Sequence, residues 1–238
     1  MENIKDIAFL VTMNFQAYVR IVFFIKPQRD FTKAVFFISI SLVSIFTTVY
    51  LILGTFALIK ASPSKGPVHW HADFLMFQCG KEIDLIDQTG FSNRGGTPTV
   101  HEHGDKRVHI EGIPETVSTA SLKNFMQSIG GYINTHLWRV PTHDGMVEIK
   151  NGDLCRGSEG VIQVFVWFTE KGVATQKKVE SFPDYTISKE AIVPPGDCII
   201  FDFDVPKEQT EYICEQYEAA EERGDLRIGW SLTLSPIP

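Results

Sequence analysis

The chain has 238 residues, of which 22 are Lys or Arg and 29 are Asp or Glu, so its formal net charge is −7. This composition fits none of the patterns typical of collagen, coiled coils or disordered chains. Residues 60–238 carry 17 basic and 26 acidic side chains. Such an acidic balance argues against a nucleic-acid partner, which requires a basic face.

Residues 1–33 form the first predicted segment. Within it, residues 7–25 are apolar but include Asn14, Gln16 and Arg20. These polar side chains favour an amphipathic helix in the cytoplasmic interface of a membrane. The alternative is a second membrane span, which would make residues 26–33 a cytoplasmic turn between two spans.

Residues 34–59 form an apolar run of 26 residues without a charged side chain. At about 1.5 Å of rise per residue, such a helix exceeds the roughly 30 Å hydrocarbon core of a bilayer. We therefore predict a transmembrane helix with the lipid bilayer as its partner. The run is not followed by a small-residue cleavage site, so we expect the helix to stay attached.

Basic residues around this helix predict its orientation. Lys26, Arg29 and Lys33 precede it, whereas only Lys60 and Lys65 follow it closely. Because positive charges are retained on the cytoplasmic side, we expect a single-pass protein of the cell membrane with a cytoplasmic N-terminus and an extracytoplasmic C-terminal domain. A two-span hairpin would leave that domain on the same side.

Residues 60–68 are rich in Pro, Ser and Gly and predict a short tether. In residues 69–238, alternating apolar and polar residues predict strands near 69–79, 98–103, 107–112, 161–169, 198–205 and 226–234. Helices are expected near 119–129 and 209–223, each followed by glycine. Without strict alternation of strand and helix, these elements predict an α+β domain with a largely antiparallel sheet and two helices.

Five of the seven histidines lie within 41 residues of this domain: His69, His71, His101, His103 and His109. Because strand residues alternate between faces, the first two share one face with Asp73. Residues 100–112 predict a hairpin. A three-residue loop at 104–106 would pair His101 with His109 and place both on one face together with His103. A two-residue loop would instead pair His109 with Glu102.

Neutral imidazoles on neighbouring strands suit Cu(II), Zn(II) or Ni(II), and an extracytoplasmic location favours copper or zinc. We therefore predict that the five clustered histidines bind a copper or zinc ion. Nearby carboxylates would be further ligands or would fix the imidazole tautomers: Asp73, Glu102, Asp105 and Glu111. The alternative is a polar surface on which each histidine bonds to water or to a carboxylate.

The chain has four cysteines, all after the predicted anchor: Cys79, Cys155, Cys198 and Cys214. An even number of cysteines on the oxidising side of a membrane predicts two disulfides, and three connectivities are open. Their spacing forms no C-x-x-C, so it indicates neither a thioredoxin-like pair nor a zinc ribbon.

The stretches HWHADFLMFQCGKEIDL, VHEHGDKRVHIEG, SLKNFMQSIGG and VPPGDCIIFDFD together resemble a family of membrane-anchored prokaryotic proteins with an H-x-H strand, an H-x-H…H-I-E hairpin and a following helix. The resemblance covers most of residues 69–205 and leaves out the anchor. It implies a single domain in a bacterial or archaeal envelope, without an assigned activity. The H-x-H strands also resemble, more loosely, small copper proteins and cupins, but the cupin glutamate and glycine spacing is not met.

Three functions follow from these features. The first is a membrane-anchored metal-binding domain for transfer, storage or structural support. The second is a structural or interaction subunit of a cell-envelope complex with other membrane subunits. The third is a metalloenzyme with Glu102 or Glu111 as proton acceptor. Since the chain lacks H-E-x-x-H, G-x-S-x-G and a phosphate-binding glycine loop, we predict no catalytic residue.

Overall fold

The computed structural model describes residues 31–89, 93–187 and 196–229, and the chain divides into two compact units, residues 1–55 and 56–238. The helix or second span predicted at 7–25 lies outside the described residues.

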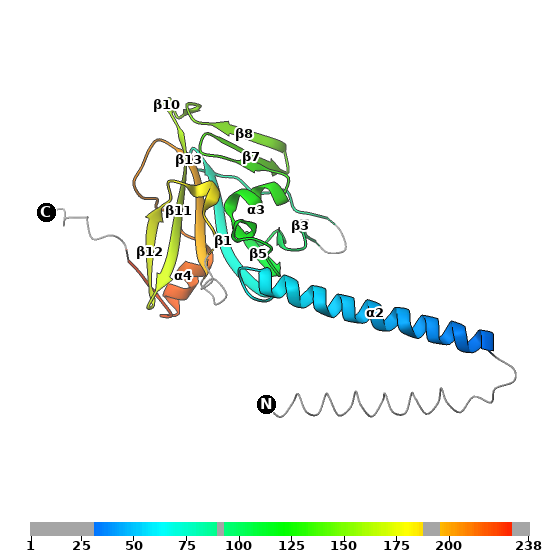
Figure 1. Cartoon of the computed structure of the whole chain (residues 1–238). Coiled ribbons are helices and arrows are strands. Elements are labelled where there is room, and N and C mark those ends of the chain that lie inside the picture. The colour runs from blue at the N-terminus through cyan, green and yellow to red at the C-terminus, as the bar shows by residue number, and fades with distance from the viewer. Residues whose placement is uncertain (1–30, 90–92, 188–195, 230–238) are drawn as a thin grey trace. The chain divides into compact units, whose positions relative to one another are not determined.

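The apolar N-terminal segment forms α2 (Phe31–Ala61), a helix of 31 residues that buries none of its side chains (Figure 1). At 1.5 Å per residue it is about 46 Å long, so it is long and apolar enough to cross a membrane. The hydroxyls of Thr47, Thr48 and Thr55 each donate to the carbonyl four residues earlier, at 2.8 Å. The polar residues of this helix are therefore compatible with a hydrocarbon environment.

Within the described residues, nine strands form the main sheet in the order β14-β12-β11-β13-β1-β5-β4-β3, with β2 paired to β1. Their bounds are β1 (Val68–Gln78), β2 (Lys81–Glu82), β3 (Gly95–Gly96), β4 (Val100–Glu102), β5 (Arg107–Gly112), β11 (Val161–Glu170), β12 (Val173–Lys178), β13 (Asp197–Asp204) and β14 (Arg227–Ile228). Only β1·β13 and β12·β14 are parallel among the described pairs. The prediction of a largely antiparallel α+β domain is confirmed.

Smaller elements complete the domain. A three-stranded sheet comprises β6 (Tyr132–Ile133), β7 (Leu137–Thr142) and β8 (Gly145–Lys150), and β9 (Leu154–Cys155) pairs with β10 (Ser158–Glu159). The helices are η1 (Val117–Ala120), α3 (Leu122–Ser128), η2 (Phe182–Asp184) and α4 (Glu215–Glu222). Sequence patterns predicted neither the three-stranded sheet nor β12.

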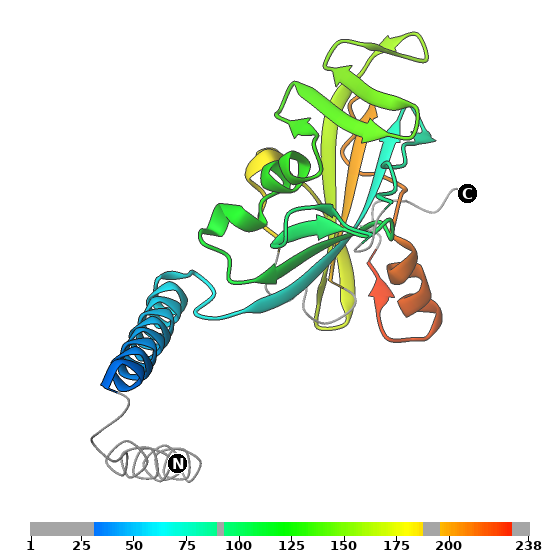
Figure 2. The same cartoon turned by 90° about the vertical axis from the view of Figure 1, so that its right-hand side faces the viewer.

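The main sheet has an apolar core on each face, and Figure 2 shows α3 and α4 on opposite sides of it. On the first face, Phe74 of β1 contacts Phe125 of α3, with ring centroids 5.3 Å apart. On the second face, Trp167 of β11 packs with Tyr217 of α4. Along the first part of β1, buried residues alternate with more exposed ones. Near its end both Met76 and Phe77 are buried, because the sheet has a core on each face there.

The second helix begins later than predicted, at residue 215 instead of 209. A disulfide joins Cys214, its N-cap, to the sheet. The preceding segment is also held by the sheet, because Trp167 Nε1 donates to the Tyr212 carbonyl at 2.9 Å and Gln176 Nε2 to the Thr210 carbonyl at 2.8 Å. These tertiary bonds hold the backbone in an irregular, non-helical path up to residue 214. The strand predicted at 226–234 is described only as far as residue 229.

Candidate metal centre

The strands that carry the clustered histidines are neighbours, with β5 between β1 and β4. Across β1 and β5, His71 lies opposite His109 and His69 lies opposite Glu111. Across β5 and β4, His109 lies opposite His101. One imidazole from each of three strands therefore stands in a row, and the hairpin register predicted from a three-residue loop is confirmed.

Strand alternation directs these imidazoles away from the core that contains α3. Trp70, Val108 and Ile110, which lie between them in sequence, are buried in that core. The exposed fraction of the side chain falls from 62% for His69 to 1% for His101. The histidine cluster thus extends from solvent at His69 to the interior at His101.

The five clustered histidines come together around His109. The centroid of its ring is 4.7 Å from that of His71, 5.0 Å from His103, 5.4 Å from His101 and 6.5 Å from His69. Two stretches of chain about 30 residues apart therefore supply imidazoles to one place on the sheet.

Two of the imidazole nitrogens are buried without a hydrogen-bond partner among the described residues, namely Nδ1 of His101 and Nδ1 of His109. An unpaired buried polar atom costs about 1–3 kcal/mol. A polar surface of hydrated histidines does not account for these two atoms, whereas a cation bound to them would.

Hydrogen bonds to two other nitrogens fix the tautomers. Asp105 Oδ2 lies 3.1 Å from His109 Nε2, and a carboxylate only accepts, so Nε2 carries the proton and Nδ1 the lone pair. The backbone carbonyl of Asn93 likewise accepts from His103 Nδ1 at 2.7 Å, which leaves Nε2 with the lone pair. Such contacts are typical of histidines that bind metal.

The buried histidines are held neutral, as metal ligands must be. Burial, followed by the charges of His109, His69 and Arg107, lowers the pKa of His71 to about 4. Burial also lowers the pKa of His101 and of His109, although nearby carboxylates oppose it. At pH 7 these imidazoles offer lone pairs instead of protons.

The ligand atoms form two groups that share His109. One is His69, His71 and His109, and the other is His101, His109 and Glu111; within each group the ligand atoms lie within 4.8 Å of one another. Imidazole nitrogens and a carboxylate oxygen are donors that Zn(II) and Cu(II) accept. Both groups can hold a metal ion.

Two of the predicted carboxylates are engaged elsewhere. Asp73 accepts from Arg107 Nε at 2.5 Å, and burial raises the pKa of Asp73 while that bond lowers it. Glu102 lies on the opposite face of β4 from His101 by strand alternation, is buried, and accepts from the backbone N–H of Gly104. Neither belongs to the two ligand groups.

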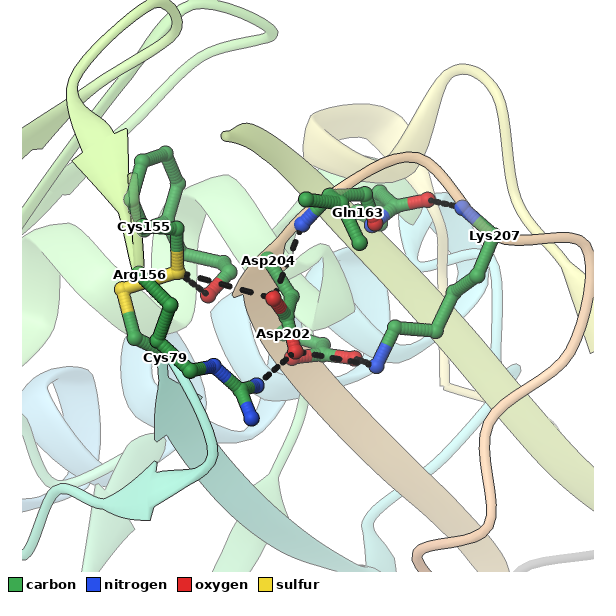
Figure 3. Close-up of a disulfide and its surroundings, with 9 residues drawn as sticks. Cys79, Cys155, Arg156, Gln163, Asp202, Asp204 and Lys207 are labelled. Atoms are coloured by element: carbon green, nitrogen blue, oxygen red, sulfur yellow. Dashed lines mark hydrogen bonds and ion pairs between the residues drawn. A yellow bond between two sulfur atoms is a disulfide. The ribbon is translucent and has the colours of Figure 1, made fainter. Parts of the chain in front are cut away.

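The cysteines form two disulfides, as the sequence predicted, and the structure selects Cys79–Cys155 and Cys198–Cys214 from the three open connectivities. Figure 3 shows the first beside ion pairs of Asp204 with Arg156, at 2.8 Å, and of Asp202 with Lys207, at 2.9 Å. Because every cysteine is in a disulfide, none offers a thiolate, and the donors of the centre are nitrogen and oxygen.

A cavity of about 240 Å³ lies between the β4–β5 hairpin and α4 and reaches Asp105 beside the cluster. Its lining includes Asp105, which bonds to His109, together with Arg107, Glu215 and Glu218. Sequence reasoning missed this cavity, and it missed Asn93, which binds His103. No local sequence pattern indicates the cavity or the contact of Asn93, because the first depends on the packing of α4 and the second on the position of the loop that contains Asn93.

No protein-family model, no curated protein and no solved structure matches the chain. The resemblance to membrane-anchored envelope proteins therefore stays a prediction, and the function is argued from the residues of the site.

Proposed function

We propose that the chain is a membrane-anchored, extracytoplasmic metal-binding domain whose five clustered histidines hold copper or zinc. The observation that carries this proposal is the pair of buried Nδ1 atoms on His101 and His109, which have no hydrogen-bond partner among the described residues and belong to imidazoles whose pKa burial lowers. Such a site resembles the environment of bound cations more than that of hydrated surface histidines.

The donor set supports copper or zinc over other ions. Every thiol is in a disulfide, which removes the soft ligands that favour Cu(I) or iron–sulfur clusters. Imidazoles with one carboxylate, Glu111, suit Zn(II) and Cu(II), whereas Mg(II) and Ca(II) prefer oxygen ligands throughout.

The proposed location follows from two features. Disulfides persist in oxidising compartments, and both lie in the domain that follows α2. The charges Lys26, Arg29 and Lys33 before the apolar run favour a cytoplasmic N-terminus. Together they support a domain on the outer side of the cell membrane, which would meet metal ions from the periplasm or the exterior.

The test is elemental analysis of the full chain, purified in mild detergent without a histidine tag. We expect stoichiometric copper or zinc in the wild type and its loss in the variant in which His69, His71, His103 and His109 are all changed to Ala. The control variant changes His136 and His143, which bond to Asn151 and Asp87 outside the cluster, and should bind metal as the wild type does. Equal metal in all three proteins would contradict the proposal.

The cavity beside Asp105 favours a metalloenzyme as a second candidate function. Its volume of about 240 Å³ is close to the lower end of small-molecule sites, roughly 300–1,000 Å³. A Zn(II) ion with an open coordination position would activate a bound water, and Asp105, which bonds to His109, links the ligand groups to this cavity. Hydrolysis of ester or phosphoester substrates by the metal-loaded chain, lost in His109→Ala, would support this candidate over simple metal binding.

A further inference from the structure

We infer that the histidine cluster holds two divalent transition-metal ions, with Glu111 as the carboxylate between them and His109 as the imidazole that both positions share. This inference rests on the proposed metal-binding function and adds to it a stoichiometry and an order of affinities.

The two positions correspond to the two ligand groups. The first, the β1 group, consists of His69, His71 and His109, and the second, the β4 group, of His101, His109 and Glu111. The shared strand β5 lies in the middle of the three, so each outer strand supplies its own ligands on its own side.

The width of the sheet separates these sides. Neighbouring strands are about 4.8 Å apart, so β1 and β4 are separated by about 10 Å. One ion with ligands at about 2.0–2.1 Å gathers atoms only across about 4 Å. The outer imidazoles form two pairs, with ring centroids 4.5 Å apart for His69 and His71 of β1, and 4.9 Å apart for His101 of β4 and His103 just after it. This arrangement favours one ion at each pair over one ion between them.

Glu111 directs one carboxylate oxygen to each side. Its Oε1 is 3.1 Å from His69 Nε2, and its Oε2 is 3.9 Å from His101 Nε2. A carboxylate in this orientation can bind two ions at once, as in two-metal sites with ions about 3.5–4 Å apart. Its negative charge also offsets the repulsion between the two cations.

His109 cannot serve both ions equally. Because Asp105 holds its Nε2–H, the neutral ring offers a single lone pair, on Nδ1. The ion that takes this nitrogen gains a ligand that the other lacks, and the second ion also meets the charge of the first. We therefore expect two binding events, the second about tenfold weaker or more.

His103 adds a ligand on the β4 side. Its Nδ1 donates to the Asn93 carbonyl, so Nε2 is free to bind an ion next to His101. Each side thereby contributes two imidazoles, from β1 on one side and from β4 and the residue after it on the other, and the middle strand contributes His109 and Glu111.

The experiment counts metal ions on the full chain in mild detergent, without a histidine tag. Native mass spectrometry should give two Cu(II) or Zn(II) per chain at saturation. The Cu(II) form should show a half-field electron paramagnetic resonance signal from two interacting ions. A single ion per chain would overturn this inference and leave the proposed function intact. No bound ion would overturn both.

Variants then assign the two positions. His69→Ala with His71→Ala should leave one ion and abolish the half-field signal. Glu111→Gln, at a side chain that is 38% exposed, should keep the fold and weaken both ions, the second by about tenfold or more and the first by less, because only the second ion also loses the charge that offsets repulsion between the cations. His136→Ala should keep both ions. Loss of both ions, or of neither, in the His69/His71 variant would contradict the assignment, as would an equal effect of Glu111→Gln on the two affinities.

Discussion

Replacing His109 by leucine should stabilise the metal-free protein and destabilise the metal-loaded one relative to the wild type. The imidazole of His109 is 12% exposed, and its Nδ1 has no partner among the described residues. Leucine removes that unpaired atom, which costs about 1–3 kcal/mol. It also removes the bond to Asp105, whose side chain is 44% exposed and whose contact is worth about 0–1 kcal/mol.

At the midpoints of these ranges, about 2 kcal/mol is gained and about 0.5 kcal/mol is lost, so the free energy of unfolding without metal should rise by about 1.5 kcal/mol in His109→Leu. In a domain of this size that corresponds to a rise in Tm of about 3–6 °C. Free metal at 100 times its Kd stabilises the wild type by about 2.7 kcal/mol, and the variant gains little because both ligand groups contain His109. The order of the two stabilities should reverse when metal is added.

Urea unfolding of the full chain in detergent, followed by tryptophan fluorescence, measures this reversal, because all four tryptophans lie after residue 61. Each protein is unfolded once with chelator and once with excess Zn(II). His136→Leu, outside the cluster, should follow the wild type within about 0.5 kcal/mol. A His109→Leu protein that is less stable than the wild type in chelator, or that gains as much from Zn(II), would refute the reasoning.

Two further predictions concern the disulfides and the pH response. Replacing both Cys79 and Cys155 by Ala should cost about 4.5 kcal/mol of unfolding free energy and replacing both Cys198 and Cys214 about 3 kcal/mol, because the loops span 76 and 16 residues; urea midpoints that reverse this order would contradict the loop-entropy argument. In the metal-free protein the imidazole of His71 should titrate near pH 4 by nuclear magnetic resonance, since burial lowers its pKa to about 4 from about 6.5 in an unfolded chain. Between about pH 4 and pH 6.5 the unfolded chain binds a proton at His71 that the folded chain does not, so stability falls as the pH is lowered through this range. A titration midpoint of His71 near pH 6.5 would show that this face of the sheet is open to water.

The sequence alone determined those features that depend on neighbours along the chain. In hydrocarbon a single apolar segment can satisfy its own backbone hydrogen bonds as a helix, and α2 covers the predicted span. Strand alternation set the face of His69 and His71. The sequence narrowed the register of residues 100–112 to two loop lengths, and the structure selected the one that pairs His101 with His109. In each case the deciding residues are at most a few positions apart.

Only the tertiary structure decided which distant segments meet. That β1 pairs with β5, and so brings His71 against His109, depends on packing Trp70 and Ile110 into one core. The choice among three disulfide connectivities depends on the same packing. An alternating pattern of apolar residues shows which face of a strand is buried but not which strand lies next to it. The order of the strands depends on how the side chains fill the core in shape and volume, and no local pattern encodes this packing.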